Sequence, residues 1–306
     1  MQVFDSIRKT EYGCCVALGF FDGVHIGHRS VISATKPMSS DICPMAVLTF
    51  KDSPANVISN TKKPLLTTNK EKLKLFEKLG VQLVYNIDFN DIKDMSAERF
   101  VKEVLHDKLN AKCVVTGFNY HFGKGGNADA DDMIKLCNNY GIKAFKCEPV
   151  LYNGTPVSST RIRNCIANGD IESANAMLGY DFSISSEVVS GNHIGNTIQT
   201  PTINQSLDQT VIIPKYGVYA SYVLVDDKTY QGATNIGTHP TVGGNDVLCE
   251  THLLDFDGGD LYGKNVQTIL KKFIREEVKF TDLESLKEQI KRDKEEITDY
   301  LNNKAR

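Results

Sequence analysis

Two hydrophobic patterns follow one another along the chain, and their order limits the fold more than any other feature. Up to about residue 150, apolar runs alternate with amphipathic helical patterns such as NKEKLKLFEKLG, SAERFVKEVLHDKL and DADDMIKLCNNYG. The apolar runs are CCVAL, MAVLTF, VQLVYNI, KCVVTGF and KAFKCEPV. Strands that are apolar on both faces and separated by helices are typical of a parallel α/β sheet. We therefore expect this half to bind a ligand at the carboxyl ends of its strands.

The second pattern alternates polar and apolar residues, and it predicts antiparallel strands. GVYASYVLVDDKTYQGATNIG, VLCETHLLDF and NVQTILKKFI all alternate, and Asp226-Asp227 marks a turn within the first of them. Residues 184–275 are therefore expected to form an antiparallel barrel or sandwich. A helical hairpin at Asn168-Gly169-Asp170, which ends near residue 182, precedes this region.

A closing helix is expected after the barrel. Thr281-x-x-Glu284 is a capping box, and an apolar helix face follows it. The residues of that face are Leu283, Leu286, Ile290, Ile297 and Leu301. Because 306 residues exceed the ~100 to 200 of a typical single domain, we expect two domains, 1–183 and 184–306.

The composition favours a cytoplasmic protein that binds small molecules. Hydrophobic residues make up 41% and charged residues 24% of the chain, no apolar run approaches the ~18 residues that a membrane span needs, and Met1 opens no signal peptide. The net charge of -3 shows no basic surplus, which argues against general affinity for nucleic acids. The eight cysteines form no Cys-x-x-Cys pair and lie mostly in apolar runs, so we expect reduced, buried thiols rather than a metal site or disulfides.

The stretch ALGFFDGVHIGHRS follows the first apolar strand and holds two histidines three residues apart. In a helix, His25 and His28 would lie on one face and could contact one target. Gly19, Gly23 and Gly27 would let the backbone approach a ligand closely, and a helix N-terminus favours anions. This combination suits a nucleoside triphosphate whose leaving pyrophosphate gains negative charge, and it predicts nucleotidyl transfer.

Three other interpretations of this half remain open on spacing alone. Asp22-Gly23 is also compatible with a plain turn that carries surface histidines. Zinc ligation by His25-x-x-His28 would require further Cys or His ligands, and none is close in sequence. GKGGNA at 123–128 formally fits a Gly-x-Gly-x-x-Ala dinucleotide fingerprint, but NYHF separates it from the preceding strand.

A second stretch, PVSSTRIRNCI at 156–166, also indicates an anion. It opens a helix with Ser158, Ser159 or Thr160 as N-cap, yet it places Arg161 and Arg163 in the first turn, where the helix dipole disfavours cations. A bound anion would resolve this conflict. The alternative is that both arginines extend into solvent, at a small cost in free energy.

Several short strings together resemble one family. GFFDGVHIGH with SSTRIR resembles the adenylyltransferase module of the prokaryotic bifunctional riboflavin kinase/FAD synthetases, and PTIN, NIGTHPT and ETHLLDF...LYGK resemble that family's riboflavin kinase module, in the family's order. The resemblance covers nearly the whole chain. It implies a Rossmann-like α/β nucleotidyltransferase domain joined to an antiparallel six-stranded Greek-key barrel with a C-terminal helix.

The resemblance also implies two reactions. The kinase module moves the γ-phosphoryl group of ATP to riboflavin, the other module adenylylates the resulting FMN to FAD with release of pyrophosphate, and both steps need Mg²⁺. By position, His25, His28 and Arg161 resemble the polyphosphate clamp, and Glu250 resembles the base on the ribityl hydroxyl. Thr202 and Asn204 resemble the metal and ATP ligands of the kinase. The positions that resemble nucleotide-binding or flavin-binding residues are Gly19, Phe20, Asp22, Gly23, Asn119, Ser159 and Thr160.

The chain departs from the family pattern in both modules. In GNHIGNTIQTPTIN, Asn196, Gln199 and Ile203 replace residues that are usually Arg, Gly and Ala, and a side chain in place of a glycine could obstruct the kinase loop. In FKDSP at 50–54, Lys51 stands where an acidic residue is expected.

These departures leave three hypotheses open. The leading one is a bifunctional enzyme that makes FMN and FAD. The second is an FMN adenylyltransferase whose barrel binds flavin without phosphorylating it. The third is a non-catalytic flavin sensor or carrier, against which the retained Glu250, His25 and His28 argue. A class I aminoacyl-tRNA synthetase also carries a HIGH string, but the chain has no Lys-Met-Ser-Lys-Ser-like loop.

Overall fold

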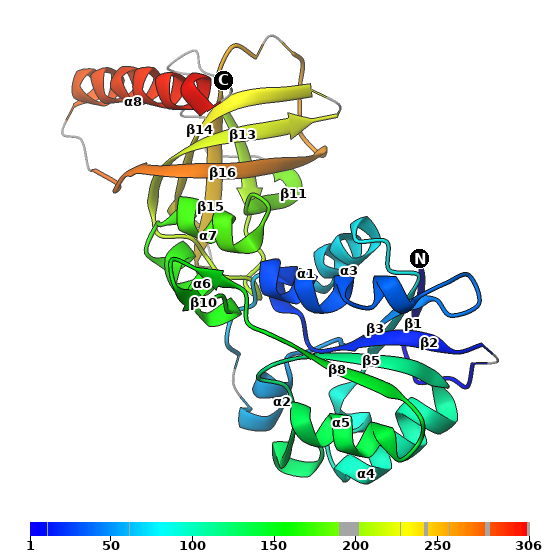
Figure 1. Cartoon of the computed structure of the whole chain (residues 1–306). Helices are drawn as coiled ribbons and strands as arrows, with labels where there is room; N and C mark the ends of the chain where they lie inside the picture. The colour runs from blue at the N-terminus through cyan, green and yellow to red at the C-terminus, as the bar shows by residue number, and fades with distance from the viewer. Residues whose placement is uncertain are drawn as a thin grey trace. The chain divides into compact units, whose positions relative to one another are not determined.

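The chain forms two compact units, Met1–Ser159 and Thr160–Arg306 (Figure 1). The computed structural model describes residues 1–10, 12–60, 62–189, 202–226, 228–241, 244–256, 258–278 and 282–304. The helical hairpin after Pro156 therefore packs mainly with the second unit. As the border between two catalytic modules, 183/184 stays a prediction.

A six-stranded parallel sheet forms the centre of the first unit, as the apolar runs predicted. The strand order is β1-β4-β3-β2-β5-β8. The strands are β1 (Gln2–Phe4), β2 (Cys14–Leu18), β3 (Met45–Phe50), β4 (Leu83–Ile87), β5 (Ala111–Gly117) and β8 (Lys143–Cys147). Strands β2 and β3 are buried throughout, because helices cover both faces. The pattern missed β1, a short edge strand with only three residues.

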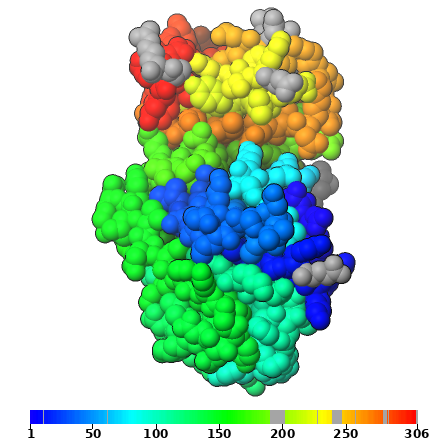
Figure 2. All heavy atoms as spheres, turned by 45° about the vertical axis from the view of Figure 1, so that its right-hand side comes forward, coloured from blue at the N-terminus to red at the C-terminus, as the bar shows by residue number. Residues whose placement is uncertain are grey.

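Helices pack on both faces of this sheet. The helices of this unit are α1 (Ile26–Ser33), α2 (Pro54–Ser59), α3 (Asn69–Lys78), α4 (Ala97–Arg99), its continuation as the π-helix η4 (Phe100–Lys108), and α5 (Ala130–Asn138). The unit also has two small hairpins, β6 (His121–Phe122) with β7 (Ala128–Asp129) and β9 (Leu151–Tyr152) with β10 (Thr155–Pro156). Cys14, Val16 and Leu18 pack against η4 and α5, whereas Cys15 and Ala17 pack against α1 and α3. The blue atoms of α1 and the light-blue atoms of α3 adjoin on this second face (Figure 2). All eight cysteines, each within the described part of the chain, are free thiols.

The second unit is a closed six-stranded barrel, and the alternating segments are its strands. Antiparallel neighbours follow the order β11-β12-β15-β14-β13-β16. The strands are β11 (Ser183–Val189), β12 (Thr202–Ser206), β13 (Gly217–Val225), β14 (Lys228–Thr241), β15 (Gly244–Leu253) and β16 (Asn265–Arg275). Closure leaves no strand edge unpaired, and alternate side chains face the interior.

Helix α7 (Ile171–Leu178) packs against β16 of the barrel, and α8 (Leu283–Lys304) packs against β13 and β14. Helix α6 (Ser159–Ala167) directly precedes α7 in the chain. Ile297 and Leu301 of α8 are fully buried against Val218 and Ala220 of β13, as the apolar face predicted. Thr281 of the expected capping box lies outside the described residues. Asp282 accepts a hydrogen bond from the backbone of Ser285 at 2.8 Å at this end of the helix.

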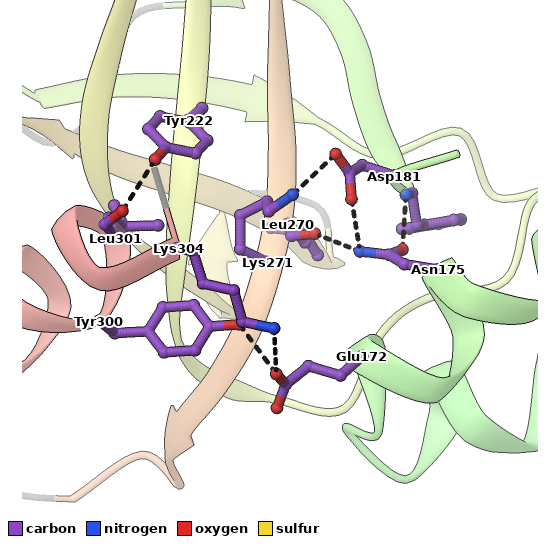
Figure 3. A network of polar contacts seen from close by, with 10 residues as sticks. Glu172, Asn175, Asp181, Tyr222, Leu270, Lys271, Tyr300, Leu301 and Lys304 are labelled. Atoms are coloured by element: carbon purple, nitrogen blue, oxygen red, sulfur yellow. Dashed lines mark hydrogen bonds and ion pairs between the residues drawn. The ribbon is translucent and has the colours of Figure 1, made fainter. Parts of the chain in front are cut away.

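Polar contacts hold α7 to the barrel (Figure 3). The side-chain amide of Asn175 donates to the carbonyl oxygen of Leu270 on β16 at 3.0 Å and to Asp181 at 3.1 Å, and its oxygen accepts from the backbone of Phe182 at 2.7 Å. Lys271 forms an ion pair with Asp181 at 2.8 Å. Within the described residues, no helix has the length and apolar character needed to cross a membrane.

Candidate functional site

The turn between β2 and α1 is buried and strained. Phe21 and Val24 adopt positive φ angles of 57° and 39°, which side chains other than glycine rarely adopt and which cluster at functional sites. Gly19 makes this turn possible, because a β-carbon there would lie 2.8 Å from the Phe21 ring. Asp22 is only 4% exposed, and its carboxylate accepts a hydrogen bond from the backbone of Leu66 at 2.8 Å. A plain solvent-exposed turn is therefore wrong for Asp22-Gly23.

The turn brings His25 and His28 together, as their spacing predicted. Their rings stack with centroids 3.5 Å apart, and His25 Nδ1 caps α1 by accepting from the backbone of His28 at 3.3 Å. His25 is 4% exposed, and burial lowers its pKa to about 4. Burial also lowers the pKa of His28 well below its ordinary value, helped by the charges of His25 and Lys72. Both imidazoles are therefore neutral at pH 7, and His25 carries its proton on Nε2.

His28 also has an unused polar atom. Its Nδ1 is buried without a hydrogen-bond partner among the described residues. Buried polar atoms usually have a partner, so an orphan beside a helix N-terminus is consistent with a site that a ligand completes.

Of the other residues predicted for this site, Ser159 contacts the turn directly, whereas Asn119 lies at the same edge of the sheet. The hydroxyl of Ser159 donates to the carbonyl oxygen of Asp22 at 3.0 Å. Asn119 is exposed just beyond β5, which neighbours β2, so it lies at the same carboxyl edge of the sheet. Thr160 and the half-buried Arg161 belong to the second unit, so their part in a phosphate clamp stays a prediction. Lys51, the departure in FKDSP, is exposed one residue beyond β3.

The predicted kinase residues lie together on the outer face of the barrel. Asn204 on β12 pairs with Glu250 on β15, and Thr202 pairs with His252. Directly opposite residues share one face, with β-carbons about 4.5 to 5.5 Å apart. Asn204 is 7% exposed and Glu250 is half-buried. The residues next to them along these strands face the interior and are fully or almost fully buried: Ile203 and Gln205 on β12, and Cys249, Thr251 and Leu253 on β15.

One of the departures is explained by this alternation. Ile203 faces the barrel interior, where it is 4% exposed and packs in a cluster with Val188 and Leu253. It therefore lies on the opposite side of β12 from Thr202 and Asn204 and does not obstruct them. Asn196 and Gln199 lie outside the described residues.

Both halves of the chain match known families. Residues 7–161 match the model of FAD synthetase, and residues 178–301 match the model of riboflavin kinase. The bifunctional riboflavin kinase/FMN adenylyltransferase of Escherichia coli (strain K12) is 36% identical over 290 residues, which cover 94% of this chain and 92% of the relative. This chain belongs to the bifunctional riboflavin kinase/FMN adenylyltransferase family. The member from Bacillus subtilis (strain 168) is 33% identical and covers 97% of this chain, with 95% of its own length matched.

A solved structure has the same fold over nearly the whole length of this chain. A crystal structure described as a macrolide-efflux protein from Streptococcus pneumoniae superposes with a TM-score of 0.86 at 29% identity, covering 96% of this chain and 97% of the other. The resemblance that the short strings indicated, and the order of its two modules, are thus confirmed.

The residues predicted to hold Mg²⁺ fit that ion in chemistry. Thr202 and Asn204 offer a hydroxyl and an amide oxygen, and Mg²⁺ in general prefers oxygen ligands and usually keeps water and substrate phosphates beside a few protein groups. Among the described residues, no group of three His, Cys, Asp or Glu side chains could hold a metal ion.

Three residues that lie near these sites were not singled out from the sequence: Asn235, Glu277 and Lys72. Asn235 on β14 pairs with Glu250 on the side away from Asn204, and its amide donates to Glu277 at 3.0 Å. Only strand pairing shows this proximity, since the residues are far apart along the chain. Lys72 on α3 is 3% exposed, and its spacing of four residues from the apolar Phe76, which places both on one helix face, was the sequence signal that could have identified it.

Proposed function

We infer that this chain makes both flavin cofactors from riboflavin. Its kinase module transfers the γ-phosphoryl group of ATP to riboflavin to give FMN, and its adenylyltransferase module joins AMP from a second ATP to FMN, giving FAD and pyrophosphate. The observation that carries this conclusion is the match of both family models, in order, along one chain. Riboflavin, FMN, FAD and ATP are the corresponding substrates and products.

For the kinase, we propose that Glu250 acts on the terminal ribityl hydroxyl. Its carboxylate accepts the hydroxyl proton while the oxygen attacks the γ-phosphorus, the bond to the β-phosphate oxygen breaks and ADP leaves. Asn204, directly opposite Glu250, and Thr202 would hold Mg²⁺ and the phosphates beside it. Mg²⁺, when bound, would neutralise charge on the phosphates. The pairing of Asn204 with Glu250 supports this arrangement, since it brings the acceptor and donor halves of the reaction onto one face.

For adenylylation, we propose that the histidine turn holds the polyphosphate of ATP. An oxygen of the FMN phosphate attacks the α-phosphorus, and pyrophosphate leaves with growing negative charge. The neutral imidazoles of His25 and His28 would donate hydrogen bonds to these oxygens at the N-terminus of α1. Gly19, Phe20, Asp22 and Gly23 would shape the turn. The residues proposed to complete this nucleotide and flavin site are Asn119, Ser159, Thr160 and Arg161.

One time course separates the candidate functions. Purified protein is incubated with riboflavin, ATP and Mg²⁺, and riboflavin, FMN and FAD are resolved by chromatography. FMN followed by FAD is the expected result. FAD formation only from supplied FMN would instead indicate a single adenylyltransferase activity, and no conversion of either flavin would indicate a sensor or carrier. A cytoplasmic location without nucleic-acid partners stays a prediction from composition.

A further inference from the structure

Lys72 on α3 is a buried cation close to the histidine turn, and the reactions proposed above give it no role. Its Nζ donates to the carbonyl oxygen of Phe50 at 2.8 Å, and to the carbonyl oxygen of Phe20 and the hydroxyl of Thr49 at 3.4 Å each. It also lies 4.4 Å from the centre of the Phe20 ring. Lysine is almost never fully buried without partners, because removing its charge from water is costly. A lysine that stays buried despite this desolvation cost is a candidate for a functional role.

The partners of Lys72 lie where two neighbouring strands end. Phe50 is the last residue of β3, and Phe20 follows the end of β2, which pairs with β3 in the parallel sheet. The hydroxyl of Thr49 donates to the same Phe20 carbonyl at 2.9 Å. One ammonium group, with its three donors, therefore joins the two strand ends at the start of the histidine turn. Ligands of parallel α/β sheets bind at this edge.

The segment that leads into α3 holds the other end of the same turn. Leu66 donates to the carboxylate of Asp22 at 2.8 Å, and Gly23 donates to the hydroxyl of Thr67 at 3.3 Å. A capping box between Thr68 and Glu71 fixes the start of α3 directly afterwards. Residues 66–72 therefore hold the turn at both ends.

The charge of Lys72 reaches the histidines as well as the backbone. Burial lowers its pKa to about 8, and the carboxylates of Asp22 and Asp52 oppose that shift. At neutral pH the ammonium is therefore still charged, and its charge contributes to the lowered pKa of His28. A fixed positive charge near His28 would also attract the phosphates that we assign to this turn.

We propose that Lys72 is a positioning residue of adenylylation: its ammonium group fixes the turn that presents His25 and His28, and its charge favours the polyphosphate there. The proposal rests on the adenylyltransferase activity inferred above. Because Lys72 is covered by Phe20, Thr49 and Phe50, it acts through the turn and through its field rather than by contact with ATP.

Two variants test this proposal against the second activity of the same chain. Lys72→Met keeps the length of the side chain but removes its charge and donors, whereas Lys72→Arg keeps a charge at all accessible pH values. Lys72→Met is expected to lower FAD formation from FMN by about tenfold or more at pH 7. Riboflavin phosphorylation by the same preparation should stay within about twofold of wild type. Wild-type FAD formation in Lys72→Met would overturn the proposal.

The pH profile provides a readout that a purely structural lysine would not change. In the wild type, FAD formation should fall as pH rises through about 8, because the folded protein then loses the Lys72 proton. His25 and His28 stay neutral throughout this window, since both pKa values are lowered. The alkaline fall should be absent from Lys72→Met and from Lys72→Arg. The same fall in Lys72→Met would overturn the proposal, whereas a wild type that never forms FAD would overturn the inferred function instead.

Discussion

Burial makes the two histidines of the turn neutral, and this changes what they offer a phosphate. They are preorganised hydrogen-bond donors rather than cations. His28→Ala is therefore expected to lower conversion of FMN to FAD by a factor of ~10² or more, with riboflavin phosphorylation near normal. Chromatography of both reactions measures this. Equal loss of both activities would contradict the assignment of His28 to one module.

The lowered pKa of His25 also makes stability depend on pH. The unfolded chain takes up a proton near the ordinary pKa of 6.5, whereas the folded protein does so only near 4. Stability is therefore present above the unfolded value and is lost as pH falls toward the folded one. From pH 7 to 5, His25 should cost about 2 kcal/mol of unfolding free energy.

Denaturant unfolding at the two pH values checks the size of this effect. His25→Gln keeps a polar side chain of similar reach but cannot titrate, so its loss of stability over the same interval should be smaller by that amount. An identical pH dependence in the variant would show that His25 does not cause it.

Glu250 tests the kinase chemistry at a single atom. Glu250→Gln keeps the size of the side chain and its hydrogen bonding but removes its basicity. Conversion of riboflavin to FMN should fall by ~10² or more, while FAD formation from supplied FMN is unchanged. Undiminished FMN production in this variant would exclude Glu250 as the base.

At the scale of elements, β14 depends on a close approach by the chain after β16. A β-carbon on Gly237 would collide with the carboxylate of Glu277, the acceptor for Asn235 beside Glu250. Gly237→Ala should displace that carboxylate and lower riboflavin phosphorylation several-fold, about 1 kcal/mol, while FAD formation from FMN is spared. Gly259→Ala is the matched control, because a β-carbon there meets no atom within 4 Å. Equal activity of both variants would show that Glu277 does not affect the kinase face.

The docking of α7 on the barrel depends on Asn175 (Figure 3). Its side chain makes three hydrogen bonds, and their loss leaves the backbone groups of Leu270 and Phe182 without this partner. Asn175→Ala should destabilise the second unit by about 1 to 3 kcal/mol, measured by denaturant unfolding. Ser173→Ala on the same helix should have little effect, because its backbone rather than its side chain bonds to Asp170. Similar losses in both variants would show that the hydrogen bonds of Asn175 are not the cause, because alanine itself favours the helix over asparagine and serine.

At the scale of the whole molecule, the FMN that one protein molecule makes need not be adenylylated by that same molecule. The His28→Ala variant is expected to release FMN but not FAD, and Glu250→Gln to make FAD only from FMN. A mixture of the two, given riboflavin, ATP and Mg²⁺, should therefore form FAD although neither variant does so alone. FMN without FAD in the mixture would show that FMN does not pass between copies.

Much of the fold was predictable because burial on two faces and burial on one face leave different sequence patterns. CCVAL and MAVLTF gave the exact extent of β2 and β3, and the alternating runs gave strands β13 to β16. The edge strand β1 was missed because three residues, partly exposed, carry too little periodicity. The choice between barrel and sandwich was also open, since closure is a property of strand pairing and not of any one strand.

The sequence by itself determined the two architectures, their order, the family and the local constellation of His25 and His28, because these depend on periodicity and on residues close together along the chain. Only the tertiary structure decided which side chains are charged and which distant residues meet. The depressed pKa values of the histidines come from burial, Lys72 is identified by three acceptors gathered from two strand ends, and Asn235 adjoins Glu250 through strand register. Each of these depends on packing between segments far apart in sequence, which a local pattern does not encode.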